Sequence, residues 1–97
     1  MQYTHLGRSG VVVSRLCLGS MNFGSLASEQ ESFKIMDEAL EMGVNFFDCA
    51  NVYGIPVRQG LSEEIIGNWL AQDSKRREQI VLTTKVHCPM GSGVNER

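Results

Sequence analysis

Residues 43–54 read GVNFFDCANVYG, in which a glycine is followed by a short apolar run, a carboxylate and a loop. The β-branched and aromatic residues from Val44 to Phe47 are typical of a β-strand. Asp48 ends this strand, and Gly43 is a natural residue to terminate a preceding helix. A helix that leads directly into an apolar strand indicates an α/β protein.

The segments on either side of this stretch are predicted to be helices. Ser28 and Glu31 form a capping box, and an apolar stripe at helical spacing follows over residues 35–42. On the other side, Ser62 is expected to cap a second helix, whose apolar face includes Trp69. The strand at Val44 to Asp48 therefore lies between two helices.

Three more segments complete the pattern. Residues 3–13 read as a hairpin with turn residues at 7–10, residues 16–18 as a short strand, and residues 80–85 as a strand that ends in a lysine. The order is a hairpin followed by β-α-β-α-β, which implies a parallel sheet with right-handed crossovers. The charged residues 73–79, with Arg76 and Arg77, are expected to form a solvated connection.

Composition excludes several classes of protein. The chain has 97 residues, enough for one domain at most, and a net charge of -2, which argues against a nucleic-acid partner and a polybasic membrane anchor. Apolar runs fall short of the ~18 residues of a spanning helix, and no signal peptide is recognisable. The three cysteines have no C-x-x-C spacing, so we expect no metal site and reduced thiols in the cytoplasm.

The strand ends carry polar groups that do not belong in a core. Each of the three parallel strands ends in such a group: the first in Gly19 and Ser20, the second in Asp48 and the third in Lys85. Sites in parallel α/β folds form at the carboxyl ends of strands. Period-two counting places Asp48 and Lys85 where adjacent strands bring them together. That proximity would lower the pKa of Asp48 and raise the pKa of Lys85. Asn45 falls on the opposite face and is assigned no role.

A phenol can join this pair. Tyr53 lies five residues beyond Asp48, in a loop that leaves the same edge of the sheet. A lysine cation stabilises a phenolate, so Lys85 would make Tyr53 a better proton donor near neutral pH. The three residues together indicate a general-acid site. An Asp and a Lys at strand ends, taken alone, are more often a solvated pair.

The motifs make the chemistry more specific. The pattern Asp48-x-Ala50-x-x-Tyr53 resembles the N-terminal part of an aldo-keto reductase, in the branch that includes voltage-gated potassium channel β subunits and bacterial reductases. The resemblance covers essentially the whole chain. The stretches that carry it are residues 3–10, 13–14, 18–24, 43–54, 62–67 and 84–85.

The resemblance implies a (β/α)₈ barrel closed at its bottom by the hairpin, and the reduction of a carbonyl by NADPH. It implies that Tyr53 donates the proton, that Lys85 tunes Tyr53, and that Asp48 pairs with Lys85 near the nicotinamide ribose. Gly19, Ser20 and Met21 would line the nicotinamide end of the cofactor. Such a barrel needs about 250 residues, so residues 1–97 would be an N-terminal fragment of the domain, with an incomplete barrel.

Three functional hypotheses follow. The first is an NADPH-dependent reductase of aldehydes or ketones, to which this chain supplies three catalytic groups. The second is a cofactor-binding regulatory subunit of a channel, and the third is a non-functional truncated product. The expected partner is a small carbonyl substrate, with no nucleic acid and no membrane insertion. On its own the chain is expected to be inactive and to associate through unpartnered apolar surface.

Overall fold

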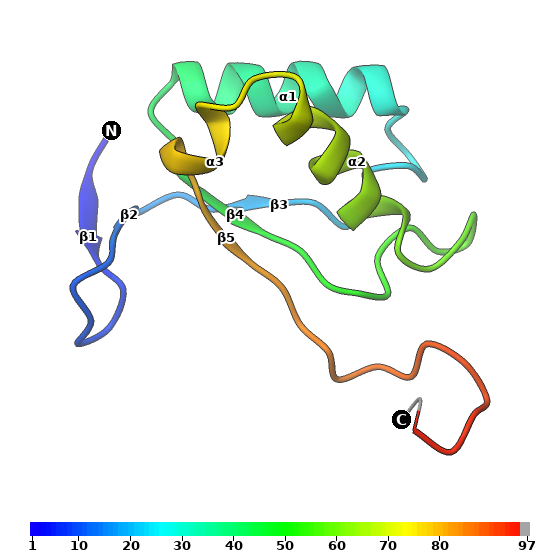
Figure 1. The fold of residues 1–97 in the computed structure, drawn as a ribbon. Helices are drawn as coiled ribbons and strands as arrows, with labels where there is room; N and C mark the ends of the chain where they lie inside the picture. The colour runs from blue at the N-terminus through cyan, green and yellow to red at the C-terminus, as the bar shows by residue number, and fades with distance from the viewer. Residues whose placement is uncertain (96–97) are drawn as a thin grey trace.

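A computed structural model describes residues 1–95 (Figure 1). The chain begins with a two-stranded hairpin and continues into a three-stranded parallel sheet with helices between its strands. The elements are β1 (Tyr3–His5), β2 (Val12–Ser14), β3 (Leu18–Gly19), α1 (Glu29–Glu41), β4 (Phe46–Asp48), α2 (Leu61–Ala71), α3 (Arg76–Gln79) and β5 (Val81–Thr83).

The parallel sheet confirms the α/β class. Its strand order is β3-β4-β5, with Gly19 beside Asp48 on one side and Thr83 beside Asp48 on the other. The strands are shorter than the sequence predicts, although Cys49 and Asn51 continue the ladder by donating to the carbonyl oxygens of Thr83 and Lys85. All three helices lie on one side of this sheet (Figure 1).

The hairpin is also confirmed, and it is fastened to the sheet by Asn45. β1 and β2 are antiparallel, with Tyr3 opposite Ser14. The Asn45 Oδ1 accepts a 2.6 Å hydrogen bond from the Ser14 amide, and its Nδ2 donates to the Val12 carbonyl oxygen at 3.2 Å. Asn45, which the sequence left without a role, therefore holds the hairpin against the start of β4.

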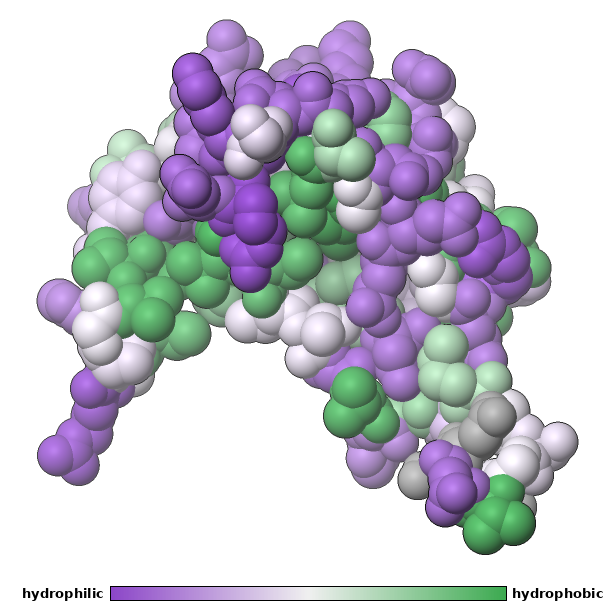
Figure 2. Space-filling model, viewed as in Figure 1, coloured by the Kyte–Doolittle hydropathy of each residue, from purple (hydrophilic) through white to green (hydrophobic). Residues whose placement is uncertain are grey.

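The core lies between the sheet and the helices. Phe47 of β4 is buried against Trp69 of α2, with ring centroids 5.7 Å apart, and Met36 of α1 and Ile65 of α2 complete the same cluster. Hydrophilic residues cover much of the outer surface of the helices in Figure 2. Burial of these large apolar side chains is the main force that holds the helices on the sheet.

The two long helices begin differently. The capping box of α1 is confirmed, because Ser28 and Glu31 each accept from the other's backbone amide. The expectation that Ser62 caps α2 is wrong. The N-cap is Gly60, two residues earlier, in the left-handed conformation (φ 85°), and the buried Ser62 hydroxyl donates to the Phe23 carbonyl oxygen at 2.7 Å.

The expectation that Arg76 lies in a solvated connection is also wrong. Its guanidinium lies 4.5 Å from the centroid of the Trp69 ring and donates to the Trp69 carbonyl oxygen at 2.7 Å and to Asp37 Oδ1 at 2.9 Å. The Trp69 indole donates to the same Asp37 oxygen at 2.8 Å. Arg76 thus joins α1, α2 and α3, which the sequence spacing does not reveal.

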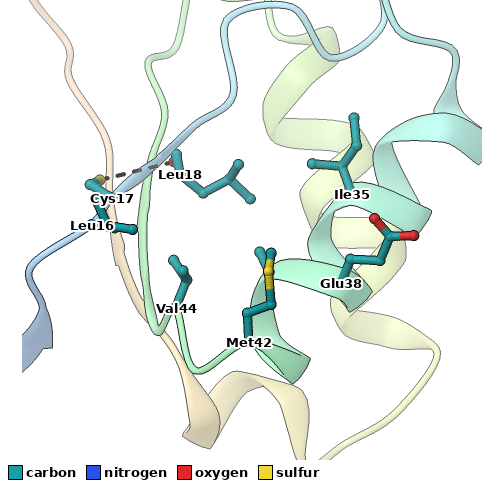
Figure 3. Close-up of a pocket in the computed structure, with 8 residues that line it drawn as sticks. Leu16, Cys17, Leu18, Ile35, Glu38, Met42 and Val44 are labelled. Atoms are coloured by element: carbon teal, nitrogen blue, oxygen red, sulfur yellow. Dashed lines mark hydrogen bonds between the residues drawn. The ribbon is translucent and has the colours of Figure 1, made fainter. Parts of the chain in front are cut away.

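An apolar groove of about 330 Å³ lies beside the edge strand β3 and α1 (Figure 3). Within it, Leu16 and Met42 are 63% and 67% exposed. The other lining residues are Cys17, Leu18, Ile35, Glu38, Ala39 and Val44. In the part of the chain that the structure describes, no helix is both long and apolar enough to cross a membrane.

Candidate active site

Asp48 lies on the face of the sheet that points away from the helices. Its neighbour Phe47 is 1% exposed beneath Trp69, and successive side chains of a strand point to opposite faces. Asp48 is the register partner of Thr83 on β5, so these two side chains share a face. Lys85 follows two residues after Thr83 and falls on that face as well.

Asp48 and Lys85 form an ion pair, as the strand pattern predicts. Lys85 Nζ donates to Asp48 Oδ2 at 2.6 Å and to the Cys49 carbonyl oxygen at 2.8 Å. Hydrogen bonds from Lys85 and Thr83 hold the pKa of the Asp48 carboxyl below its usual range, and the bond to Asp48 raises the pKa of Lys85. Both groups are therefore charged over the whole neutral range.

Thr83 is a member of this cluster that sequence reasoning missed. Its hydroxyl donates to Asp48 Oδ1 at 2.6 Å, so each carboxylate oxygen of Asp48 has a separate donor. The sequence contains a signal for this residue, because Thr83 and Lys85 are two positions apart and share one face of the strand. Predicting the contact with Asp48 also required the register between β4 and β5, which the sequence does not give.

Tyr53 lies beside Lys85, as predicted. The Lys85 Nζ is 5.0 Å from the centroid of the Tyr53 ring. Backbone bonds fix the loop, since the Tyr53 amide donates to the Ala50 carbonyl oxygen and the Tyr53 carbonyl oxygen accepts from Ser62. Gly54 follows with φ 122°, and a side chain there would collide with the Arg58 carbonyl oxygen. The arrangement places a half-buried phenol beside a cation, which suits a general acid.

Besides Asp48, three residues are expected to bind the cofactor, and they lie at the same edge but in different environments. Gly19 pairs with Asp48, and a Cβ added to Gly19 would meet no atom within 4 Å. Met21 is 60% exposed. Ser20 is buried, and both its amide and its hydroxyl donate to the Asp48 carbonyl oxygen, at 3.1 and 2.8 Å. Ser20 therefore fixes the backbone of Asp48, and any contact between Ser20 and a cofactor stays a prediction.

Cys49 follows Asp48 but is turned into the core. It is 1% exposed, and burial is the main cause of its raised thiol pKa. A raised pKa keeps the sulfur protonated and poorly nucleophilic. Its carbonyl oxygen, which accepts from Lys85, is the part of Cys49 that contributes to the site.

Comparison with known proteins identifies relatives of this chain. Residues 15–97 match the model of the aldo/keto reductase family. The chain is 58% identical over 90 residues to the uncharacterized oxidoreductase YrpG of Bacillus subtilis, covering 93% of this chain and 28% of YrpG. It is 40% identical over 92 residues to protein tas of Escherichia coli, covering 92% and 26%. It is 39% identical over 98 residues to a probable voltage-gated potassium channel subunit beta of Arabidopsis thaliana, covering 100% and 28%.

The chain thus spans little more than a quarter of the length of these relatives. The cluster of Asp48, Thr83, Lys85 and Tyr53 lies within the matched residues.

Proposed function

Because the chain belongs to the aldo/keto reductase family, we propose that it supplies three catalytic groups to an enzyme that reduces an aldehyde or ketone to an alcohol with NADPH. The observation that carries the proposal is the cluster itself. Lys85 Nζ lies 2.6 Å from Asp48 Oδ2 and 5.0 Å from the centroid of the Tyr53 ring. An acid, a cation beside it and a carboxylate that holds the cation are together what carbonyl protonation needs.

The proposed architecture is the first part of a (β/α)₈ barrel. Three parallel strands with their helices on one side support it, as does the position of the cluster at the carboxyl ends of the strands. The face that carries Asp48 and Thr83 would then line the barrel interior, where a substrate enters from the same end.

The residues at this edge suit a nicotinamide cofactor. The surface beside Gly19 is open, Met21 offers an exposed apolar side chain, and the Asp48 carboxylate can accept a hydrogen bond from a ribose hydroxyl. Gly19, Met21 and Asp48 would therefore flank the cofactor, with Ser20 holding the backbone between them. Bound NADPH would supply the hydride for the carbonyl carbon.

The chain's own residues would handle the proton. The Tyr53 hydroxyl donates its proton to the carbonyl oxygen as negative charge develops there. Lys85 stabilises the phenolate that remains, because its ammonium lies beside the ring. Asp48 keeps Lys85 charged and in place. Solvent then returns a proton to Tyr53 before the next turnover.

A chimera with a longer relative tests this proposal. This chain replaces the matching segment of YrpG, which is 58% identical to it, and NADPH consumption is followed with a panel of aldehydes and ketones. Tyr53→Phe is expected to lower kcat by ~10² to 10⁴ with NADPH binding retained. Tyr3→Phe removes the other tyrosine hydroxyl of the chain, in the hairpin, and is the matched control.

Two outcomes would contradict the proposal. Turnover by the Tyr53→Phe chimera at the rate of the unmodified chimera would remove Tyr53 from the mechanism. Failure of the folded chimera to bind NADPH or to reduce any carbonyl in the panel would remove the reductase activity itself.

A further inference from the structure

The Asp48 carboxylate is held from two sides, and only one side is explained by the proposed mechanism. Lys85 occupies Oδ2, while Thr83 donates to Oδ1 at 2.6 Å. The second contact of the Thr83 hydroxyl, to the Phe47 carbonyl oxygen, is much longer at 3.4 Å. A hydroxyl has one proton, so the bond to the carboxylate is the one it makes.

We propose that Thr83 is a positioning residue of the site: its hydroxyl fixes the orientation of the Asp48 carboxylate, and through it the place of Lys85 beside Tyr53. This inference rests on the proposed function for the part that concerns catalysis. The structural part, a hydroxyl that locks a carboxylate, stands on the contacts alone.

The exposure of the ion pair explains why the site needs a second hydrogen bond to the Asp48 carboxylate. The Asp48 and Lys85 side chains are 38% and 46% exposed, so water competes for both. An exposed ion pair by itself is weak and leaves its side chains free to rotate. A carboxylate that also accepts from a strand neighbour has one orientation, because its two oxygens have donors in two fixed directions. Thr83 lies on the register partner position in β5, so the backbone holds this donor rigidly.

The effect reaches Tyr53 through one intermediate. Lys85 Nζ is held by Asp48 Oδ2 and by the Cys49 carbonyl oxygen, and it lies 5.0 Å from the Tyr53 ring centroid. If Oδ2 turned away, the ammonium would lose one of these two acceptors. The distance between the Lys85 ammonium and the Tyr53 ring would then no longer be fixed.

The adjacent residue provides a matched control. Thr84 has the same side chain, is exposed, and lines a small hollow on the helix side with Ile66 and Leu70. Thr83→Val, at the last residue of β5, and Thr84→Val, at the next residue, make the same chemical change on opposite faces of the sheet. Thr83→Ser keeps the donor with one methyl group fewer.

The test is an NMR titration of aspartate carboxyl carbons in the YrpG chimera, where the Asp48 signal is identified by its loss in Asp48→Asn. Thr83→Val is expected to raise the pKa of Asp48 toward its ordinary value, while Thr83→Ser and Thr84→Val leave it low. Amide shifts of β4 serve as the control that the strand remains folded. An unchanged Asp48 titration in Thr83→Val, or an equal change in Thr84→Val, would overturn the proposal.

A measurement on the unmodified chain covers the case in which Thr83→Val does not fold. The Thr83 hydroxyl proton is expected to exchange slowly with water while Asp48 is ionised, and to lose that protection as the carboxyl is protonated. Fast exchange at every pH would contradict the lock.

Turnover measurements test whether Thr83 acts in catalysis through Asp48 and Lys85. In the YrpG chimera, Thr83→Val is expected to lower kcat by about 10-fold to 100-fold with little change in KM, and Thr83→Ser is expected to restore it. An inactive parent chimera would contradict the proposed function, and the carboxyl titration would still decide whether Thr83 locks Asp48. A normal kcat with a raised Asp48 pKa would overturn the positioning role.

Discussion

Lys85 Nζ lies 2.6 Å from Asp48 Oδ2, although 37 positions separate the two residues in the chain. Their proximity follows from the parallel pairing of β4 with β5, which puts Asp48 beside Thr83 and Lys85 one step further on the same face. Most of the polar contacts of the proposed site follow from this one register.

We expect Lys85→Met in the YrpG chimera to reduce turnover and to change the shape of its pH profile. Without the ammonium beside the ring, the phenolate that proton donation leaves on Tyr53 loses the charge that stabilises it, so transfer of the proton to the carbonyl oxygen becomes slower. NADPH binding should survive better than turnover. Lys34→Met, which removes an exposed lysine of α1, is the control. A pH–rate profile unchanged in height and shape would show that Lys85 is only a surface charge.

The ion pair is expected to make stability depend on pH in a defined window. Asp48 has a lowered pKa in the folded chain, so its contribution is complete above its unfolded value of about 4 and is lost as pH falls through the lower folded value. Lys85 has a raised pKa, so its contribution is complete below about 10.4 and is lost as pH rises through the higher folded value.

The measurement is the difference in thermal midpoint between the YrpG chimera and its Asp48→Asn variant across pH. The difference should be largest between about pH 5 and pH 9 and should shrink on both sides. Titrating groups far from the pair contribute equally to the thermal midpoints of both proteins, so their contributions cancel in the difference. A difference that stays constant from acid to alkali would mean that neither charge contributes through the pair.

Arg76→Met is expected to destabilise the folded chain by about 1–2 kcal/mol, because it removes a cation stacked on Trp69 together with its bonds to α1 and α2. The Arg76 side chain is only 17% exposed, so water replaces these contacts poorly. Arg77→Met, one residue along the same helix and exposed, is the matched control. Equal denaturant midpoints for the two variants of the chimera would contradict a role for Arg76 in joining the helices.

A polypeptide of residues 1–97 is expected to bind a hydrophobic dye or to self-associate, because the groove beside β3 leaves Leu16 and Met42 in contact with water (Figure 3). Met42→Lys should reduce dye fluorescence. Leu26→Lys changes an apolar residue that is 83% exposed outside the groove, and it should have little effect. A monomer that binds no dye would show that the groove is closed in solution.

The sequence by itself determined the order of the elements other than α3, and it brought together most of the residues of the proposed site. Apolar periodicity, turn residues and the capping box of Ser28 and Glu31 are local signals, and each corresponds to an element of the structure. Strand parity also placed Asp48 and Lys85 on one face, because the side-chain period of a strand is two residues. Tyr53 followed from its place in the loop after Asp48.

Only the tertiary structure decided contacts that depend on register and on packing between distant segments. Thr83 donates to Asp48 because β4 and β5 pair at one register out of several that their lengths allow. Asn45 holds Ser14, and Arg76 stacks on Trp69, because folding brings together segments that no local pattern relates. The start of α2 moved from Ser62 to Gly60 for the same reason: the Ser62 hydroxyl is bonded to Phe23, 39 residues away, and is no longer free to cap a helix.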